Sequence, residues 1–165
     1  METRLNTIHD LLDGLNKSYR QTGELLENQI NAVVQNQLES LLDAMEELIT
    51  HQENTDELEA QLRTQVEALA GELNADTSTS LGRLLPLISA DTSQLSNMRS
   101  QLITNIEKAR SYHQQLMQLL QFAQDHTNET LRSIHVLANH HDLRYNQSGK
   151  TASTRNKTFA VNQTA

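Results

Sequence analysis

Several features that support β-rich, disulfide-bonded or membrane-spanning proteins are rare or missing in this chain of 165 residues. There is no cysteine, which excludes disulfide bonds, thiolate metal ligands and a cysteine nucleophile. One proline and five glycines supply few turns, whereas a β-sandwich or barrel needs a turn signal about every 8–12 residues. No stretch reaches the ~18 consecutive apolar residues of a membrane-spanning helix. These absences favour an all-α fold and predict no insertion into a membrane.

Charge is distributed unevenly along the chain. From Arg144 onward there are four basic residues and no acidic one, and since the formal net charge is −8, residues 1–143 carry −12. Such an acidic body repels phosphate, so nucleic acid is not an expected partner, whereas the basic end suits an acidic one. The first fourteen residues hold four charged side chains and no apolar run, so no secretory signal is expected there.

Apolar residues recur at helical spacing and predict an antiparallel bundle of three long helices and one short helix. The first helix covers residues 5–34, where Gly14 and Gly23 each cost about 1 kcal/mol relative to alanine. Whether it continues into the second helix or turns near residues 35–37 is open. A break gives the more compact solution, because a continuous helix of ~70 residues would be about 100 Å long.

The second helix shows the clearest pattern, an apolar seam over residues 34–73 with a period of about 3.5 residues. Nine of the twelve seam positions are apolar. The three polar seam positions follow one another and form a polar gap in the seam. This gap indicates either a local weakness or a wider, more hydrated end of the bundle, and Leu58 can partly bridge it. The three polar seam positions are Gln52, Thr55 and Glu59.

Capping signals delimit the second and the last helix. Asn36, with Glu39 three residues later, is predicted to cap the second helix, and Asp-Thr-Ser-Gln at residues 91–94 is a capping box for the last one. Residues 71–93 between them form the connector. Within it, the segment LGRLLPLI at residues 81–88 predicts a short apolar turn of helix.

The last helix is predicted from about residue 92 to 142, and its apolar stripe is wider than a single seam requires. A second surface is therefore expected to be covered by another helix or by a partner. The periodicity stops after Leu143, and the polar residues 146–165 are expected to be disordered when alone. The predicted organisation is a helical bundle over residues 1–143 and a flexible basic tail over residues 144–165.

The triplet Gly149-Lys150-Thr151 looks like the end of a phosphate-binding loop, which reads G-x-x-x-x-G-K-[ST] between a strand and a helix. Arg144 stands where the first glycine is required. No strand is expected before the triplet and no helix after it. A single glycine in a disordered segment does not build a nest of backbone N–H groups, so no nucleotide site is expected.

Other side chains that support catalysis are present without the spacing that catalysis needs. His135, His140 and His141 are close in sequence, but a metal pair on a helix needs a four-residue spacing, and five residues turn the helix by about 140°. The acidic pairs Glu46-Glu47 and Asp56-Glu57 are typical of a solvated helix face. No G-x-S-x-G nucleophile motif occurs. We therefore expect no enzyme, no cofactor and no metal.

Three segments, taken in order, resemble the FlgN-type flagellar export chaperones. The first is a pair of Leu/Glu-rich helices around a polar junction, at residues 25–62. The second is LGRLLPLI, which leads into a long final helix. In the third, that helix gives way to Tyr145-Asn-Gln-Ser-Gly149 within a polar tail. The resemblance covers nearly the whole chain.

The resemblance implies a cytoplasmic, substrate-specific chaperone of the flagellar type III export system. Such a chaperone binds the disordered ends of hook–filament junction proteins, of the FlgK and FlgL types, and delivers them to a component of the export gate. It implies a client-binding surface on the last helix and a gate-docking contact in the tail. The implied client-binding residues are Leu116, Leu119, Leu120, Ile134 and Leu137. The implied gate-docking residues are Tyr145 and Gly149.

Two alternatives remain beside the chaperone. A structural coiled-coil or scaffold subunit would self-associate through the seam at residues 34–73 and bind no client. A metal-dependent helical bundle enzyme would take up Zn²⁺ or Ni²⁺ tightly. The sequence leaves open whether the protein is a monomer or a dimer.

Overall fold

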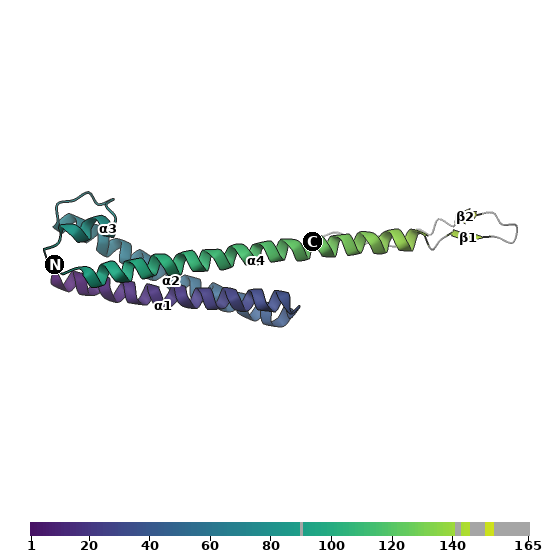
Figure 1. Ribbon diagram of the computed structural model, residues 1–165, viewed down its shortest axis with the longest axis horizontal. Helices are drawn as coiled ribbons and strands as arrows, with labels where there is room; N and C mark the ends of the chain where they lie inside the picture. The colour runs from purple at the N-terminus through teal and green to yellow at the C-terminus, as the bar shows by residue number, and fades with distance from the viewer. Residues whose placement is uncertain (90, 141–142, 146–150, 154–165) are drawn as a thin grey trace. The chain divides into compact units, whose positions relative to one another are not determined.

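The computed structural model describes residues 1–89, 91–140, 143–145 and 151–153, with side chains as far as residue 136. The chain separates into two units, Met1–Leu120 and Gln121–Ala165. The predicted boundary between residues 143 and 144 stays a prediction. Figure 1 labels the elements, which are α1 (Glu2–Val34), α2 (Leu38–Glu72), α3 (Leu81–Leu84), a 3₁₀ turn (Leu85–Leu87), α4 (Ser93–His140), β1 (Leu143–Tyr145) and β2 (Thr151–Ser153).

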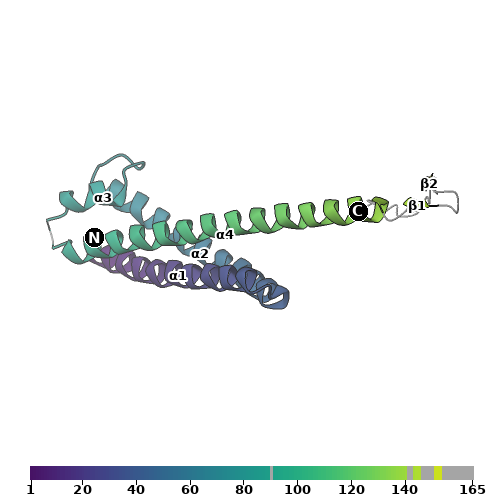
Figure 2. The same cartoon turned by 45° about the vertical axis from the view of Figure 1, so that its right-hand side comes forward.

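The all-α class is confirmed, with three long helices and one short helix. Helices α1 and α2 are not continuous, because the chain turns at residues 35–37 and the two helices lie side by side as a hairpin (Figures 1 and 2). Asn36 adopts a φ of 55°, in the left-handed region that asparagine tolerates better than most residues. Its predicted capping role is wrong, since the N-cap of α2 is Gln37 and no side chain caps the helix.

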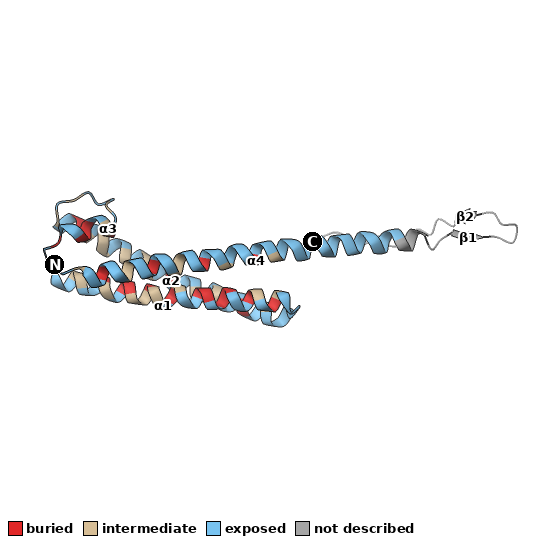
Figure 3. Ribbon diagram, viewed as in Figure 1, coloured by how far each residue is buried: buried red, intermediate tan, exposed pale blue. Residues whose placement is uncertain are grey.

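The core of the first unit forms where the apolar faces of α1, α2, α3 and the first part of α4 meet (red in Figure 3). Burying a leucine side chain of this kind contributes about 1.5–3 kcal/mol. A second, smaller cluster joins Leu26 of α1 to Ala109 and Leu116 of α4. The main cluster includes Ile8, Leu12, Leu15, Leu69, Leu84, Leu95 and Leu102.

The polar gap predicted in the α2 seam is heterogeneous in the structure. Thr55 is completely buried, whereas Gln52 is exposed. Leu58 packs against the main core cluster beside the gap, as predicted. At Thr55 the gap is neither hydrated nor empty, because the hydroxyl is hydrogen-bonded to Ser18 of α1 at 2.6 Å between the two oxygens.

Helix α4 begins at Ser93 and ends at His140, within two residues of the prediction. Asp91 accepts a hydrogen bond from the Ser93 backbone N–H at 2.9 Å, and this contact holds the pKa of the Asp91 carboxyl below its usual range. In the connector, α3 approaches α4 closely at Gly82. A Cβ atom there would lie 2.8 Å from Cζ of Arg99, so a larger residue at this position would require the end of the Arg99 side chain to shift.

The second unit contains the remainder of α4 and a short strand pair. Strands β1 and β2 are antiparallel, with Leu143 opposite Ser153 and Tyr145 opposite Thr151. Strand β2 lies in the stretch predicted to be disordered, and its three residues are an exception to that prediction. Tyrosine and threonine favour strands, which fits a local pairing here. Residues 146–150 and 154–165 of the predicted tail lie outside the described part.

Candidate functional site

Three of the predicted client-binding residues lie on α4 in the first unit, in graded environments. Leu116 is only 5% exposed and packs with Leu26 and Ala109. Leu119 is half-buried, and Leu120 is 36% exposed. In this conformation Leu116 therefore holds α4 to α1, and only the neighbouring leucines reach the surface.

The other two predicted residues lie on α4 in the second unit, where residues 121–136 are all exposed (pale blue in Figure 3). Ile134 and the neighbouring Leu131 are each 56% exposed. Residues three apart share one side of a helix, so these two form one apolar surface, which we call the distal α4 face. The backbone of Leu137 continues α4, and its side chain lies outside the described part.

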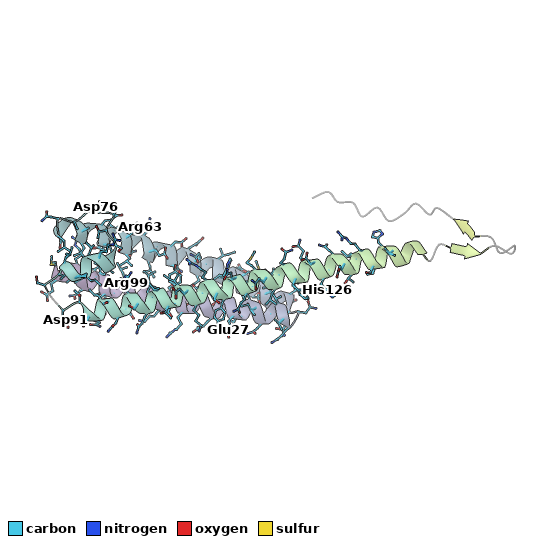
Figure 4. All side chains as sticks on the ribbon, turned by 45° about the horizontal axis from the view of Figure 1, so that its top comes forward. Glu27, Arg63, Asp76, Asp91, Arg99 and His126 are labelled. Atoms are coloured by element: carbon cyan, nitrogen blue, oxygen red, sulfur yellow. The ribbon has the colours of Figure 1, made fainter. Side chains whose placement is uncertain are left out.

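Further apolar side chains emerge elsewhere around this part of α4. Phe122 and Val136 are both more than half exposed. The rings of Phe122 and His126 stack with centroids 6.3 Å apart and planes 3° apart. His126, labelled in Figure 4, is one turn after Phe122. Exposed apolar side chains therefore lie on more than one side of this part of α4.

Of the two predicted gate-docking residues, Tyr145 lies in the strand pair. Tyr145 ends β1, and its backbone pairs with Thr151 of β2. The position of its side chain, and the whole of Gly149, lie outside the described part. One expectation about this region is wrong: a strand, β1, does precede the Gly-Lys-Thr triplet. The next described element is strand β2 rather than a helix, and Arg144 still stands at the first glycine position, so a phosphate-binding loop is still not expected.

The first unit contains a groove that the sequence pattern did not predict. It has a volume of about 470 Å³ and lies between α1, α2, α4 and the loop at residues 77–80. Its apolar lining comes from all three long helices, and the rim is polar. The apolar lining residues are Leu15, Leu62, Val66, Leu102 and Ile106, and the charged rim residues are Glu59, Arg63 (labelled in Figure 4) and Glu67.

Tyr19 and Glu59 form the principal polar contact in this groove, where the Tyr19 hydroxyl donates a hydrogen bond to the Glu59 carboxylate. Burial, the hydrogen bond and the negative charge of Glu59 together raise the pKa of Tyr19 to about 12. The sequence held one signal for this contact, because Glu59 occupies a position of the α2 seam where an apolar residue is expected. A buried partner for a carboxylate was not inferred from it.

Ser18 and His51 lie close together without forming a nucleophile and base. Nε2 of His51 is 3.1 Å from Oγ of Ser18 and 3.0 Å from the Ser18 carbonyl oxygen. A carbonyl has no proton to donate, so Nε2 carries the proton and points it at Ser18. The same nitrogen is then not available as a base for the Ser18 hydroxyl. Among the described residues, no group of three or more His, Asp or Glu side chains is arranged for a metal ion.

No helix in the described part of the chain is long and apolar enough to cross a membrane. The fold and its surfaces define an all-helical protein whose exposed apolar helix faces suit the binding of another polypeptide. A family model described as FlgN protein matches residues 1–153, nearly the whole chain, and the chain belongs to this family. The resemblance noted from the sequence is confirmed. FlgN proteins are chaperones of flagellum biogenesis that bind flagellar export substrates. No curated protein and no solved structure matches the chain.

Proposed function

We propose that this protein is the cytoplasmic chaperone of hook–filament junction proteins of the FlgK and FlgL types, and that it carries their disordered ends to the export gate. Membership of the FlgN family supports the general role. The observation that carries the specific proposal is the distal α4 face, where Leu131 and Ile134 stand exposed in a stretch of helix with no buried residue from 121 to 136. An amphipathic client segment covers such a face by helix-to-helix packing.

The client-binding surface proposed here keeps Ile134 and Leu137 from the sequence prediction and adds Leu131. Leu119 and Leu120 are accessible in part on the first unit, and Leu116 supports the helix from inside the bundle. A disordered client loses conformational entropy when it binds, which keeps the affinity moderate for a given contact area. Release of such a client therefore needs no nucleotide, which fits a chaperone rather than an enzyme.

The gate-docking proposal rests on Tyr145 and Gly149, together with the four basic residues from Arg144 onward. A positively charged segment is attracted to an acidic docking site. Client binding and gate docking would then use different parts of the second unit, so that the protein engages both partners at once.

A culture experiment tests the proposed function. In a strain lacking this gene, the amounts of the junction proteins in the growth medium are expected to fall, while the secretion of the hook protein continues. Restoring the gene is expected to restore the junction proteins. Unchanged secretion of the junction proteins in the deletion strain would contradict the proposal.

A self-associating scaffold is less well supported. Within one chain, Thr55 and Leu69 of the predicted seam are buried, and Leu62, Val66 and Leu73 pack against the main core cluster, so the second half of the seam is covered without a second copy. Analytical ultracentrifugation of the full chain distinguishes the two functions, because the scaffold requires a stable oligomer at micromolar concentration.

A further inference from the structure

Helix α2 carries an exposed apolar stripe that the fold does not use. Four large apolar side chains near its start are between 44% and 68% exposed. Their spacing of four, three and four residues keeps them within about 60° of one another around the helix, at about 100° per residue. We call these residues the α2 stripe: Leu38, Leu42, Met45 and Ile49.

The α2 stripe is a second apolar face, distinct from the one that packs in the bundle. The packed face of α2 contains the buried residues Ala44, Thr55 and Leu69. This face lies about 120° around the helix from the stripe. Leu41 and Leu48, both half-buried, bridge the two faces. A contiguous apolar surface that is not required for packing indicates an interaction site.

An acidic ridge borders the α2 stripe on the side away from the packed face. Glu39, Glu46 and Glu53 are spaced seven residues apart, and all three are exposed. Residues at this spacing follow one line along a helix and occupy positions equivalent to the charged flanks of a coiled-coil seam. None of the three is in an ion pair with another described residue.

The acidic ridge argues against a second copy of this chain as the occupant. In an antiparallel pair of α2 stripes the same flanks meet, so Glu39 would approach Glu53 of the other copy and like charges would repel. In a parallel pair the ridge would meet the opposite flank. That flank holds Leu41 and Leu48, and offers no cation.

We propose that the α2 stripe binds an amphipathic helix of another polypeptide that carries Lys or Arg beside its own apolar stripe. The stripe spans residues 38–49, about 16 Å of helix, so three turns of a partner cover it. Basic side chains at seven-residue spacing on the partner match the three carboxylates of the ridge. The charge of −12 on residues 1–143 attracts such a partner before contact. This site is separate from the distal α4 face and does not depend on the proposed function.

Titration calorimetry of the full chain at low salt tests this proposal with two synthetic helical peptides of about three heptads. Both peptides have the same leucine stripe, and their flanking positions are all Lys in one and all Glu in the other. The Lys peptide is expected to bind one to one and at least about tenfold more tightly than the Glu peptide. Leu42→Gln with Ile49→Gln is expected to weaken the Lys peptide at least about tenfold. The matched control, Thr50→Ala with Asn54→Ala, changes exposed polar residues of the same helix and is expected to bind normally.

A charge reversal makes the test specific to the ridge. Glu46→Lys with Glu53→Lys is expected to reverse the preference, so that the Glu peptide binds more tightly than the Lys peptide. Equal binding of both peptides to the unmodified chain, or normal binding by the Leu42→Gln/Ile49→Gln variant, would overturn the proposal. The proposal would also be overturned if the Leu131→Gln/Ile134→Gln variant lost binding of the Lys peptide while the Leu42→Gln/Ile49→Gln variant kept it.

Sedimentation velocity decides between this partner and a second copy. The full chain is expected to show no dimer that depends on the α2 stripe. A dimer that Leu42→Gln with Ile49→Gln converts to monomer would assign the stripe to self-association and overturn the proposal.

Discussion

Thr55 of α2 and Ser18 of α1 are joined by a hydrogen bond of 2.6 Å between their hydroxyl oxygens, inside the bundle. Thr55 donates its own proton to the His51 carbonyl at 3.0 Å, so Ser18 is the donor to Thr55. Nε2 of His51 donates a hydrogen bond to the Ser18 carbonyl, so that Ser18, His51 and Thr55 form one hydrogen-bonded layer. Every buried polar side-chain atom in this layer has a partner, and the layer fixes α1 and α2 in one register.

Thr55→Val tests this layer because it keeps the shape of the side chain and removes only the hydroxyl. The Ser18 hydroxyl then loses its acceptor in a buried position, and we expect the free energy of unfolding to fall by about 1–3 kcal/mol. Urea denaturation followed by circular dichroism measures the change. Thr64→Val is the matched control, since Thr64 is exposed and bonds only to its own helix. Equal losses in the two variants would show that the layer adds no stability.

Tyr19→Phe tests the contact between Tyr19 and Glu59. The pKa of Tyr19 is raised from 10.0 to about 12 in the folded protein, so the contact stabilises the fold fully below pH 10. The contribution is lost as the pH rises through about 12. We expect the variant to lose about 1 kcal/mol at pH 8.

Between pH 10 and 12 the unmodified protein is expected to lose stability more steeply than the Tyr19→Phe variant. Urea denaturation at several pH values, together with absorbance of the tyrosinate, measures both effects. Parallel stability curves for the two proteins would contradict the assignment.

Gly14 and Gly82 are predicted to respond differently to alanine. A Cβ atom at Gly14 would lie 3.7 Å from the Leu58 side chain, an ordinary contact, and alanine favours the helix by about 1 kcal/mol. We therefore expect Gly14→Ala to raise the melting temperature. Gly82→Ala places a Cβ atom 2.8 Å from Cζ of Arg99, so the flexible end of that side chain must shift and the gain should be smaller. Thermal denaturation compares them, and a larger gain for Gly82→Ala would refute the close approach at α3.

Deleting residues 145–165 is expected to separate client binding from delivery. The deleted segment contains Tyr145 and Gly149, whereas helix α4 is complete at His140. The shortened chain should therefore bind the junction protein with unchanged affinity and fail to restore its secretion in the deletion strain. Tyr145→Ala is the narrower variant of the same test. Normal secretion of the junction protein with the shortened chain would show that the tail is not needed for docking to the export gate.

Helical periodicity predicted the order and type of the helices because each helix must bury an apolar face. The ends of α4 were predicted to within two residues, and the turn at residues 35–37 was one of two open possibilities. Periodicity does not show which of two apolar faces packs. Leu38 and Met45 belonged to the predicted seam and are exposed, whereas Ala44 beside them is buried.

The candidate site was predicted less well, for reasons of packing. Leu116 and Ile134 both continue the apolar pattern of the last helix, yet one is buried in the bundle and the other is exposed. Their difference depends on where α1 and α2 provide a contact, which is a property of several elements together. The hydroxyl layer at Thr55 was also hidden, because a threonine in a seam looks the same whether its hydroxyl is paired or hydrated.

The distal α4 face is the surface that we propose binds the disordered end of a junction protein. Calorimetric titration of the full chain with terminal segments of the junction proteins from the same genome tests it most directly. Leu131→Gln with Ile134→Gln is the test variant, and Gln124→Ala with Asn128→Ala, which changes exposed polar residues of the same stretch, is the control.

We expect a one-to-one complex whose affinity falls at least about tenfold in the test variant and stays the same in the control. Both variants should keep the helical circular dichroism of the unmodified chain. Undiminished binding by the Leu131→Gln/Ile134→Gln variant would contradict the assigned surface, and no binding of any junction segment to the unmodified chain would contradict the proposed function itself.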